Sequence, residues 1–167
     1  MSDTRRNSTL PAGSFTVWQL VLSVLWFGMV FAIAFIEAPL KFQAPGITIP
    51  LGLGIGRLVF AALNISEAVI LILLLIISFK GASTRLGGVR LKLLIGLIVV
   101  YVSKVAIVRP PLNSRTDLVL QGADPGQSPW HYIYIGLDLV LLTLLLWFIL
   151  KTVSILKNSL SVKAEIT

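Results

Sequence analysis

The chain has 167 residues, of which 56% are hydrophobic and only 13% charged, and its mean hydropathy is +0.94. Soluble domains carry about 25% charged residues, so this composition excludes an ordinary soluble domain and predicts an all-α integral membrane protein. The lack of cysteine and the single histidine exclude thiolate catalysis, iron–sulfur clusters, thiolate metal sites and a haem held between two histidines of the chain, and we expect no cofactor and no metal ion.

Four apolar runs approach the roughly 20 residues that a helix needs to cross the hydrocarbon core of a bilayer. They cover residues 16–38, 57–79, 91–108 and 130–150, after a polar, turn-rich tail at 1–14 that we predict to be disordered. None of the runs alternates polar and apolar residues with the period of a barrel strand. The sequence therefore predicts a single transmembrane domain, a four-helix bundle.

The first apolar run contains bulky aromatic residues such as Trp26 and Phe27. Because bulky residues and near-spanning length disfavour removal as a signal peptide, we expect this run to be retained as a helix. It is predicted to end near Pro39, so that its last turn places the carboxylate of Glu37 at the membrane boundary.

The loop after the first run is interrupted by Pro39, Pro45 and Pro50 and is otherwise apolar. It cannot form one regular helix, and we expect it to lie on the membrane surface or to fold back against the bundle. Thr48 followed by Pro50 is typical of a helix start, so the second helix can begin before Arg57.

The sequence GLGIG at 52–56 has no preceding strand and no downstream acidic partner, which disfavours a phosphate-binding loop. Gly52 and Gly56 are instead four residues apart, a spacing that lets transmembrane helices approach closely. We interpret these glycines as a packing motif.

The third run, 91–108, is predicted to be stopped by the sequence RPP at 109–111, and a long loop rich in Pro, Gly and Asp follows it. The fourth run opens with Trp130, Tyr132 and Tyr134, aromatic residues that are typical of a membrane interface. We expect His131 at the same headgroup level.

The net charge of +7 would suggest a nucleic-acid partner in a soluble protein, but here the basic residues are sorted by topology. Nine lie in the two tails and the loop between the second and third runs, where Arg90 is expected, and four lie in the other two loops. The positive-inside rule therefore predicts cytoplasmic termini in the inner (plasma) membrane and two outward-facing loops. We therefore expect these basic residues to interact with the lipid bilayer and not with a nucleic acid.

Polar side chains inside the predicted spans gather on particular helix faces. At about 100° per residue, the polar positions of the second helix fall within about a quarter of its circumference, and the same holds for the fourth helix. The two faces are formed by Arg57, Asn64 and Glu67 on the second helix and by His131, Tyr134 and Asp138 on the fourth.

A charged side chain in hydrocarbon costs about 2.5–3.5 kcal/mol on insertion scales, so these groups are expected to face the bundle interior. Lys104 is the natural counter-ion. It can neutralise only one of Glu67 and Asp138, so the other must be protonated, pair with an arginine or contact water. The inner halves of the second and fourth helices contain nothing ionisable, so any site is expected to open outward.

This polar cluster has three interpretations: a structural ion-pair network that fixes helix register, a site for a ligand, ion or proton, and an interface with another subunit. The candidate site residues are Glu37, Arg57, Asn64, Glu67, Lys104, Arg115, His131, Tyr134 and Asp138.

Residues 35–67 and 109–134 resemble uncharacterised bacterial four-span membrane proteins, which are distantly similar to the transmembrane protein 205 and domain-of-unknown-function group. The resemblance implies the same polar face and brings no established activity, and Lys104 stands where this group is expected to have an uncharged polar residue. The matching positions are Glu37, Pro39, Gly56, Arg57, Phe60, Asn64, Glu67, Arg115, Ser128, His131, Tyr134 and Asp138.

The functional hypothesis is a multi-pass membrane protein that handles a small molecule, an ion or protons in an outward-opening polar cluster. The alternative is a structural or accessory subunit that binds a membrane-protein partner or a second copy of the chain. An intramembrane enzyme would need His131 as a base oriented by Asp138, and the sequence contains no nucleophile or cofactor motif to support it.

Overall fold

The computed structural model describes residues 12–80, 88–124, 126 and 128–165, and these residues contain helices and connecting turns but no strand. The predicted tail at 1–14 lies outside the described residues up to position 11, and residues 12–14 belong to the first helix. In chain order the elements are α1 (Ala12–Phe31), the π-helical η1 (Ala32–Glu37), α2 (Ala38–Leu40), the 3₁₀ turn η2 (Lys41–Gln43), α3 (Ile49–Lys80), α4 (Gly88–Val102), the π-helical η3 (Ser103–Val108), α5 (Arg109–Leu120) and α6 (Pro129–Glu165).

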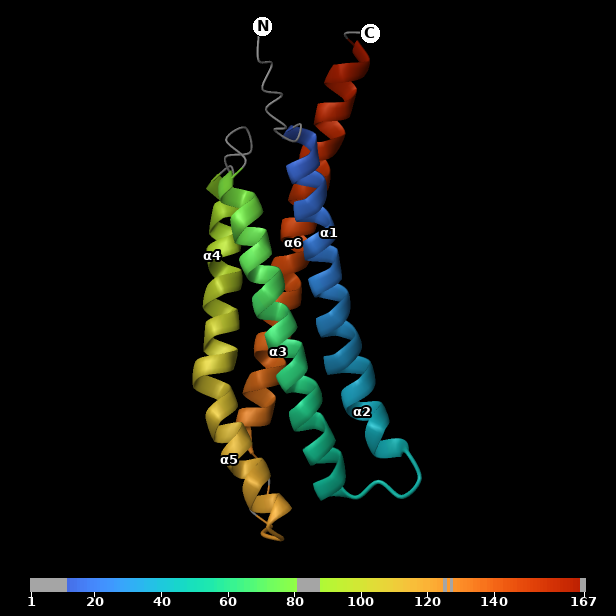
Figure 1. Cartoon of the computed structure of the whole chain (residues 1–167), viewed down its shortest axis with the longest axis vertical. Helices are drawn as coiled ribbons and strands as arrows, with labels where there is room; N and C mark the ends of the chain where they lie inside the picture. Colours follow the sequence, from blue (N-terminus) through green and yellow to red (C-terminus); the bar gives the residue numbers. More distant parts are fainter. Residues whose placement is uncertain (1–11, 81–87, 125, 127, 166–167) are drawn as a thin grey trace, which may run out of the picture.

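These elements join into four long helical spans that run side by side (Figure 1). The start of α1 and the end of α6 lie at one end of the bundle, and the α2–α3 and α5–α6 connections lie at the other (Figure 1). The predicted all-helical fold class is confirmed, and all four spans are long and apolar enough to cross a membrane, which is compatible with a multi-pass protein. The spans are Ser14–Gln43, Ile49–Lys80, Gly88–Leu120 and Pro129–Ser159.

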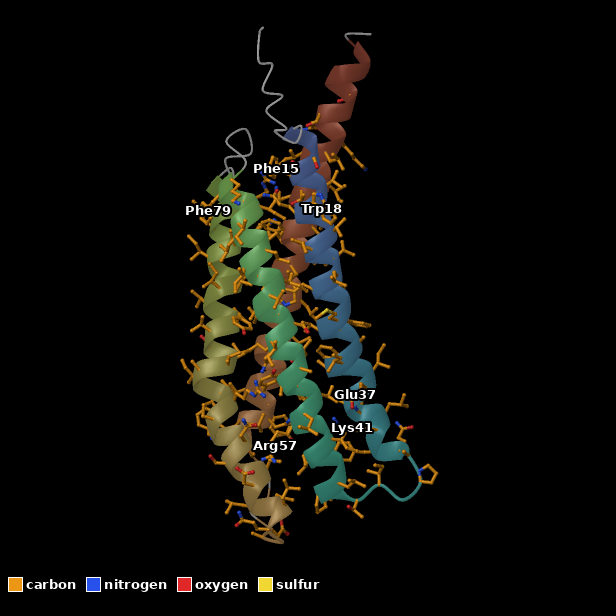
Figure 2. All side chains as sticks on the ribbon, in the orientation of Figure 1. Phe15, Trp18, Glu37, Lys41, Arg57 and Phe79 are labelled. Atoms are coloured by element: carbon orange, nitrogen blue, oxygen red, sulfur yellow. The ribbon has the colours of Figure 1, made fainter. Side chains whose placement is uncertain are left out.

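The bundle core is a leucine-rich layer between the spans, because α1 packs against both α3 and α6 and α4 packs against α6. Leu74, Leu97 and Leu145 are fully buried there. Large apolar side chains such as Leu58 and Phe79 are instead exposed, at 71% and 72%, as expected for helices whose outer faces contact lipid. Figure 2 shows side chains projecting outward from every span.

The first and third spans are longer than predicted, because neither ends at its prolines. Each proline sequence is preceded by a π turn, in which the backbone N–H of Ala38 bonds Ile33 and that of Arg109 bonds Lys104, five residues back. Proline lacks an N–H and its ring clashes with the preceding turn of a regular helix, so the wider π turn lets the chain continue. The helix then restarts with proline in its first turn.

The second span begins at Ile49, as the threonine and proline pattern allowed. The Thr48 hydroxyl accepts a hydrogen bond from the Leu51 N–H at 3.3 Å, which satisfies one of the free donors at the start of α3.

Replacing Thr48 with alanine is therefore expected to lower the unfolding free energy by about 1 kcal/mol, because one N–H at the helix start loses its acceptor. Unfolding in mixed micelles with increasing sodium dodecyl sulfate measures the change. Thr143→Ala is the control, since that hydroxyl donates to the Leu139 carbonyl within its own helix and caps no helix end. Equal losses in both variants would contradict the capping role.

The third span, Gly88–Leu120, ends at a turn that contains a glycine. Gly122 has φ +88°, a conformation that side chains other than glycine rarely adopt. Its N–H bonds the Val119 carbonyl at 3.0 Å, and the Ala123 N–H bonds the Leu118 carbonyl at 3.0 Å. This pair of bonds ends α5 and turns the chain back toward α6.

Candidate functional site

A network of three buried charges connects three of the four spans. Glu67 of α3, Lys104 of η3 and Asp138 of α6 have side chains that are 0%, 0% and 1% exposed. The Lys104 ammonium lies 3.2 Å and 3.3 Å from the two Glu67 oxygens and also contacts Oδ1 of Asp138. One cation therefore lies between two carboxylates, where the sequence allowed for pairing with only one.

The first span joins this network through Trp26. Its indole N–H donates a hydrogen bond of 3.0 Å to Oε1 of Glu67, and the whole residue is buried. Glu67 thus receives donors from α1 and η3, and a charged acceptor makes both bonds stronger than neutral ones. The aromatic ring of Tyr134 covers the ammonium of Lys104, with 5.0 Å from Nζ to the ring centroid.

Asn64 lies on the same face of α3, one turn from Glu67, and ties two tyrosines to the network. The Tyr134 hydroxyl donates to its side-chain oxygen at 3.1 Å, and the Tyr101 hydroxyl donates to its backbone carbonyl at 2.9 Å. Asn64 is 1% exposed, so these bonds hold α3, α4 and α6 in register within a dry interior.

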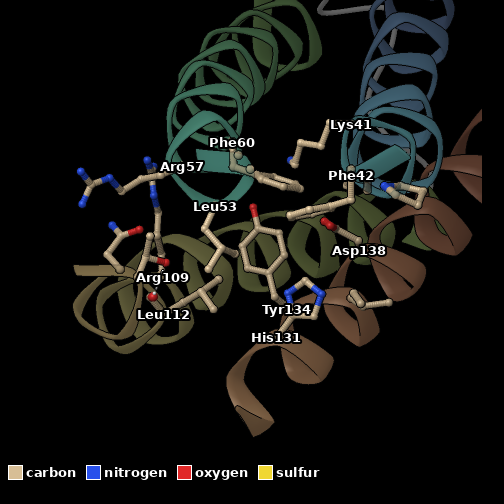
Figure 3. A pocket seen from close by; sticks show the side chains of 18 of the residues that line it. Lys41, Phe42, Leu53, Arg57, Phe60, Arg109, Leu112, His131, Tyr134 and Asp138 are labelled. Carbon is tan, nitrogen blue, oxygen red and sulfur yellow. Dashed lines mark hydrogen bonds between the residues drawn. The ribbon is translucent and has the colours of Figure 1, made fainter. Parts of the chain in front are cut away.

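A pocket of about 450 Å³ lies above the network, that is, on its side toward the α2–α3 and α5–α6 connections, where Figure 2 places Lys41 and Arg57. Figure 3 shows the lining of this pocket from close by. Every span contributes to its lining. Of the three network charges, Asp138 is the only one among the described residues that lines it, and the cavity ends at this residue, whose side chain is 1% exposed. Lys104 fills the space between that carboxylate and Glu67. The ionisable side chains of the lining are Lys41, Arg57, Arg109, His131, Tyr134 and Asp138.

The three cations of the pocket differ in how well they are paired. Lys41 forms an ion pair of 3.3 Å with Glu37, and Arg57 pairs with Asp117. No carboxylate of the described residues lies within ion-pair distance of Arg109. Within the part of the chain that the structure describes, Arg109 is therefore a pocket guanidinium without a carboxylate beside it.

At the base of the pocket, Asp138 is a carboxylate with few hydrogen-bond donors around it. Apart from the Lys104 contact to Oδ1, neither of its oxygens receives a hydrogen bond of normal geometry from the residues that the structure describes. A buried carboxylate normally accepts several donors, so this one has acceptor capacity to spare toward the pocket.

Aromatic and aliphatic side chains form the walls between these two ends. Phe60 and Tyr134 pack edge to face with ring centroids 5.5 Å apart. Phe42 faces them from the first span (Figure 3). Its ring lies against Gly52, where an added Cβ would come within 2.3 Å, and Gly56 meets the end of Lys41 in the same way at 2.8 Å. The two glycines thus allow a close approach, but of side chains from η2 rather than of a helix backbone.

The structure brings together most of the candidate residues chosen from the sequence. Asn64, Glu67, Lys104, Tyr134 and Asp138 form the buried network, and Arg57 and His131 line the pocket above it. Glu37 instead pairs with Lys41 beside the pocket. Arg115 lines a separate pocket of about 610 Å³ nearer the α5–α6 connection, where its guanidinium bonds the Gly126 carbonyl.

Three residues beside the candidate site were not among the candidates chosen from the sequence: Trp26, Lys41 and Arg109. Gln19, Ser23 and Trp26 follow one another at helical spacing in the first span, and the indole N–H of Trp26 was the available signal for a buried acceptor. Lys41 was expected in a loop because the first helix was predicted to end near Pro39. Arg109 was expected in a loop because the third helix was predicted to stop at the RPP sequence that begins with it.

The expectation that Arg90 lies in a loop is wrong. It belongs to the first turn of α4, is only 5% exposed, and donates a hydrogen bond of 3.0 Å to the Gln19 side-chain oxygen. Gln19 in turn donates to the Ser78 hydroxyl at 3.2 Å. The helix begins earlier than predicted, so this arginine points into the bundle and forms a second polar layer near the termini.

Among the described residues, no three His, Asp or Glu side chains converge in the way that a metal site requires. Comparison of the chain with protein-family models, with curated proteins and with solved structures gave no match. The resemblance to the four-span group therefore stays a prediction, and the geometry of the pocket is what bears on function.

Proposed function

We propose that this protein is a multi-pass protein of the plasma membrane that takes up a small molecule from the outer side, in the pocket above the Glu67–Lys104–Asp138 network. Both termini are then cytoplasmic, as the distribution of basic residues favours. The observation that carries the proposal is that Asp138 belongs both to the pocket lining and to the buried network.

This shared residue gives the pocket a way to act on the helices. A group that binds Asp138 from the pocket shares this carboxylate with Lys104, which contacts Oδ1, and so weakens the attraction between Lys104 and Asp138. Lys104 can then shift its contact toward Glu67, which is held by Trp26 of the first span. Occupancy of the pocket is thereby coupled to contacts among all four spans, which is what a carrier or a ligand sensor requires.

The chain has no natural cysteine, so single cysteines can report whether the pocket contains water and from which side it opens. Ile135→Cys places a thiol in the pocket wall, and Gly136→Cys places one at nearly the same depth on the exposed face, where an added Cβ meets nothing within 4 Å. A membrane-impermeant maleimide added to intact cells is expected to label Ile135→Cys and to leave Gly136→Cys largely unlabelled, because lipid keeps that thiol from reacting.

Asn158→Cys is the control for orientation, since it is exposed near the end of α6 and is expected to react only after the membrane is opened. Labelling of Asn158→Cys in intact cells would reverse the proposed topology. Equal labelling at positions 135 and 136, or no external labelling at 135, would contradict an outward-opening, water-filled pocket.

A further inference from the structure

We infer that the pocket binds an organic anion with a ring-sized apolar body and a hydrogen-bond donor at the end opposite its negative charge. The inference rests on the proposed function, because it needs a pocket that is open to water. It follows from the way in which charge, apolar surface and free acceptor capacity are ordered along the cavity.

The outer part of the cavity selects an anion. Lys41 and Arg57 are each held by a carboxylate, whereas Arg109 has none within ion-pair distance among the described residues. A guanidinium binds carboxylate, sulfonate or phosphate groups through paired hydrogen bonds. In Figure 3, Arg57 and Arg109 lie together on one side of the pocket.

The inner part selects a donor and rejects a second negative charge. Asp138 closes the base of the cavity with acceptor capacity that no described residue uses fully. A hydroxyl or amine N–H at the inner end of a ligand would satisfy that carboxylate, whereas another anionic group would be repelled by it. A ligand can therefore bind in only one direction, with its charge toward the mouth.

The middle of the cavity sets the size and chemistry of the ligand body. His131 and Asp138 are separated by about 10 Å along α6, at about 1.5 Å per residue. Phe42 and Phe60 provide aromatic surface over this distance, together with Leu53 and Leu112. A volume of about 450 Å³ holds one aromatic ring with a short chain. It is too large for an inorganic anion to contact the whole lining and too small for a lipid with two chains.

The test uses para-hydroxyphenylpropionate as the probe, which combines a carboxylate, a ring and a hydroxyl donor. Phenylpropionate lacks the donor, and tyramine has the hydroxyl but a cation in place of the anion. Calorimetric titration of the full chain in phosphatidylcholine nanodiscs is expected to give the tightest binding for the hydroxylated acid, weaker binding for phenylpropionate and none for tyramine.

Arg109→Gln is expected to weaken binding of the probe by about 10-fold or more, because a charge-assisted pair is lost. Lys151→Gln removes an exposed cation from the other end of α6 and is expected to leave the affinity unchanged. Leu53→Trp fills the pocket without altering its charge and should abolish binding even if Arg109→Gln proves poorly folded.

Three results would overturn the inference: tyramine binding as tightly as the hydroxylated acid, loss of probe binding when phosphatidylglycerol is added to the nanodiscs, or no binding of either acid at millimolar concentration. The second result would assign the anion site to a lipid headgroup. External labelling of Ile135→Cys together with any of the three would leave the proposed function standing and remove only this ligand class.

Discussion

Replacing Lys104 with methionine is expected to lower the unfolding free energy by about 3–5 kcal/mol, the cost of leaving a buried ion pair without one partner. Methionine keeps much of the side-chain volume, so the loss reports charge rather than packing. The wild-type ammonium serves both Glu67 and Asp138, and in the variant two carboxylates face each other in a dry interior. Unfolding in mixed micelles, followed by circular dichroism, measures the change.

Two further variants identify the cause of that loss. Lys151→Met removes an exposed lysine and is expected to change stability by no more than about 0.5 kcal/mol. The triple variant Glu67→Gln, Lys104→Met, Asp138→Asn removes all three charges and is expected to recover most of the lost stability, since no uncompensated charge remains. A triple variant as unstable as Lys104→Met would show that the lysine acts mainly by filling space.

Replacing Trp26 with phenylalanine is expected to cost about 2–4 kcal/mol, combining a lost hydrogen bond to a charged acceptor with the space left by the smaller ring. Trp26 is fully buried, and its indole N–H is the donor that the first span gives to Glu67. The same unfolding measurement applies to this variant.

Trp147→Phe is the matched control, because that indole is 51% exposed on the outer face of α6 and its loss should change stability little. The hydrogen bond itself is isolated by a double-mutant cycle of Trp26→Phe with Glu67→Met, which removes the acceptor, and the coupling energy is expected to be about 0.5–3 kcal/mol. A coupling near zero would mean that the tryptophan stabilises the bundle by packing alone.

Lys104 and Trp26 distinguish this bundle from one that is held together by leucine packing alone. Lipid tails are as apolar as leucine, so helices in a bilayer gain little hydrophobic free energy by associating with one another. A network that takes Trp26 from the first span, Glu67 from the second, Lys104 from the third and Asp138 from the fourth supplies directional contacts instead. The pocket adjoins this network at Asp138, so a ligand in the pocket would meet a residue that also holds the helices together.

Much of the fold and part of the site followed from the sequence alone. Composition and the lengths of the apolar runs predicted four helical spans, because a bilayer core tolerates few other backbone structures. Helical spacing placed Asn64 and Glu67 on one face, as it did Tyr134 and Asp138, and these residues do meet inside the bundle. The cost of burying polar groups in hydrocarbon makes such patterns informative.

Only the tertiary structure decided how those faces are partnered. One lysine lies between two acids because three spans converge on it, and sequence spacing within each helix does not specify the distance between helices. The π turns before Pro39 and Pro110 continue the spans and so place Lys41 and Arg109 at the pocket. Proline predicts a break from local sterics alone, whereas packing against neighbouring helices stabilises the wider turn that replaces it.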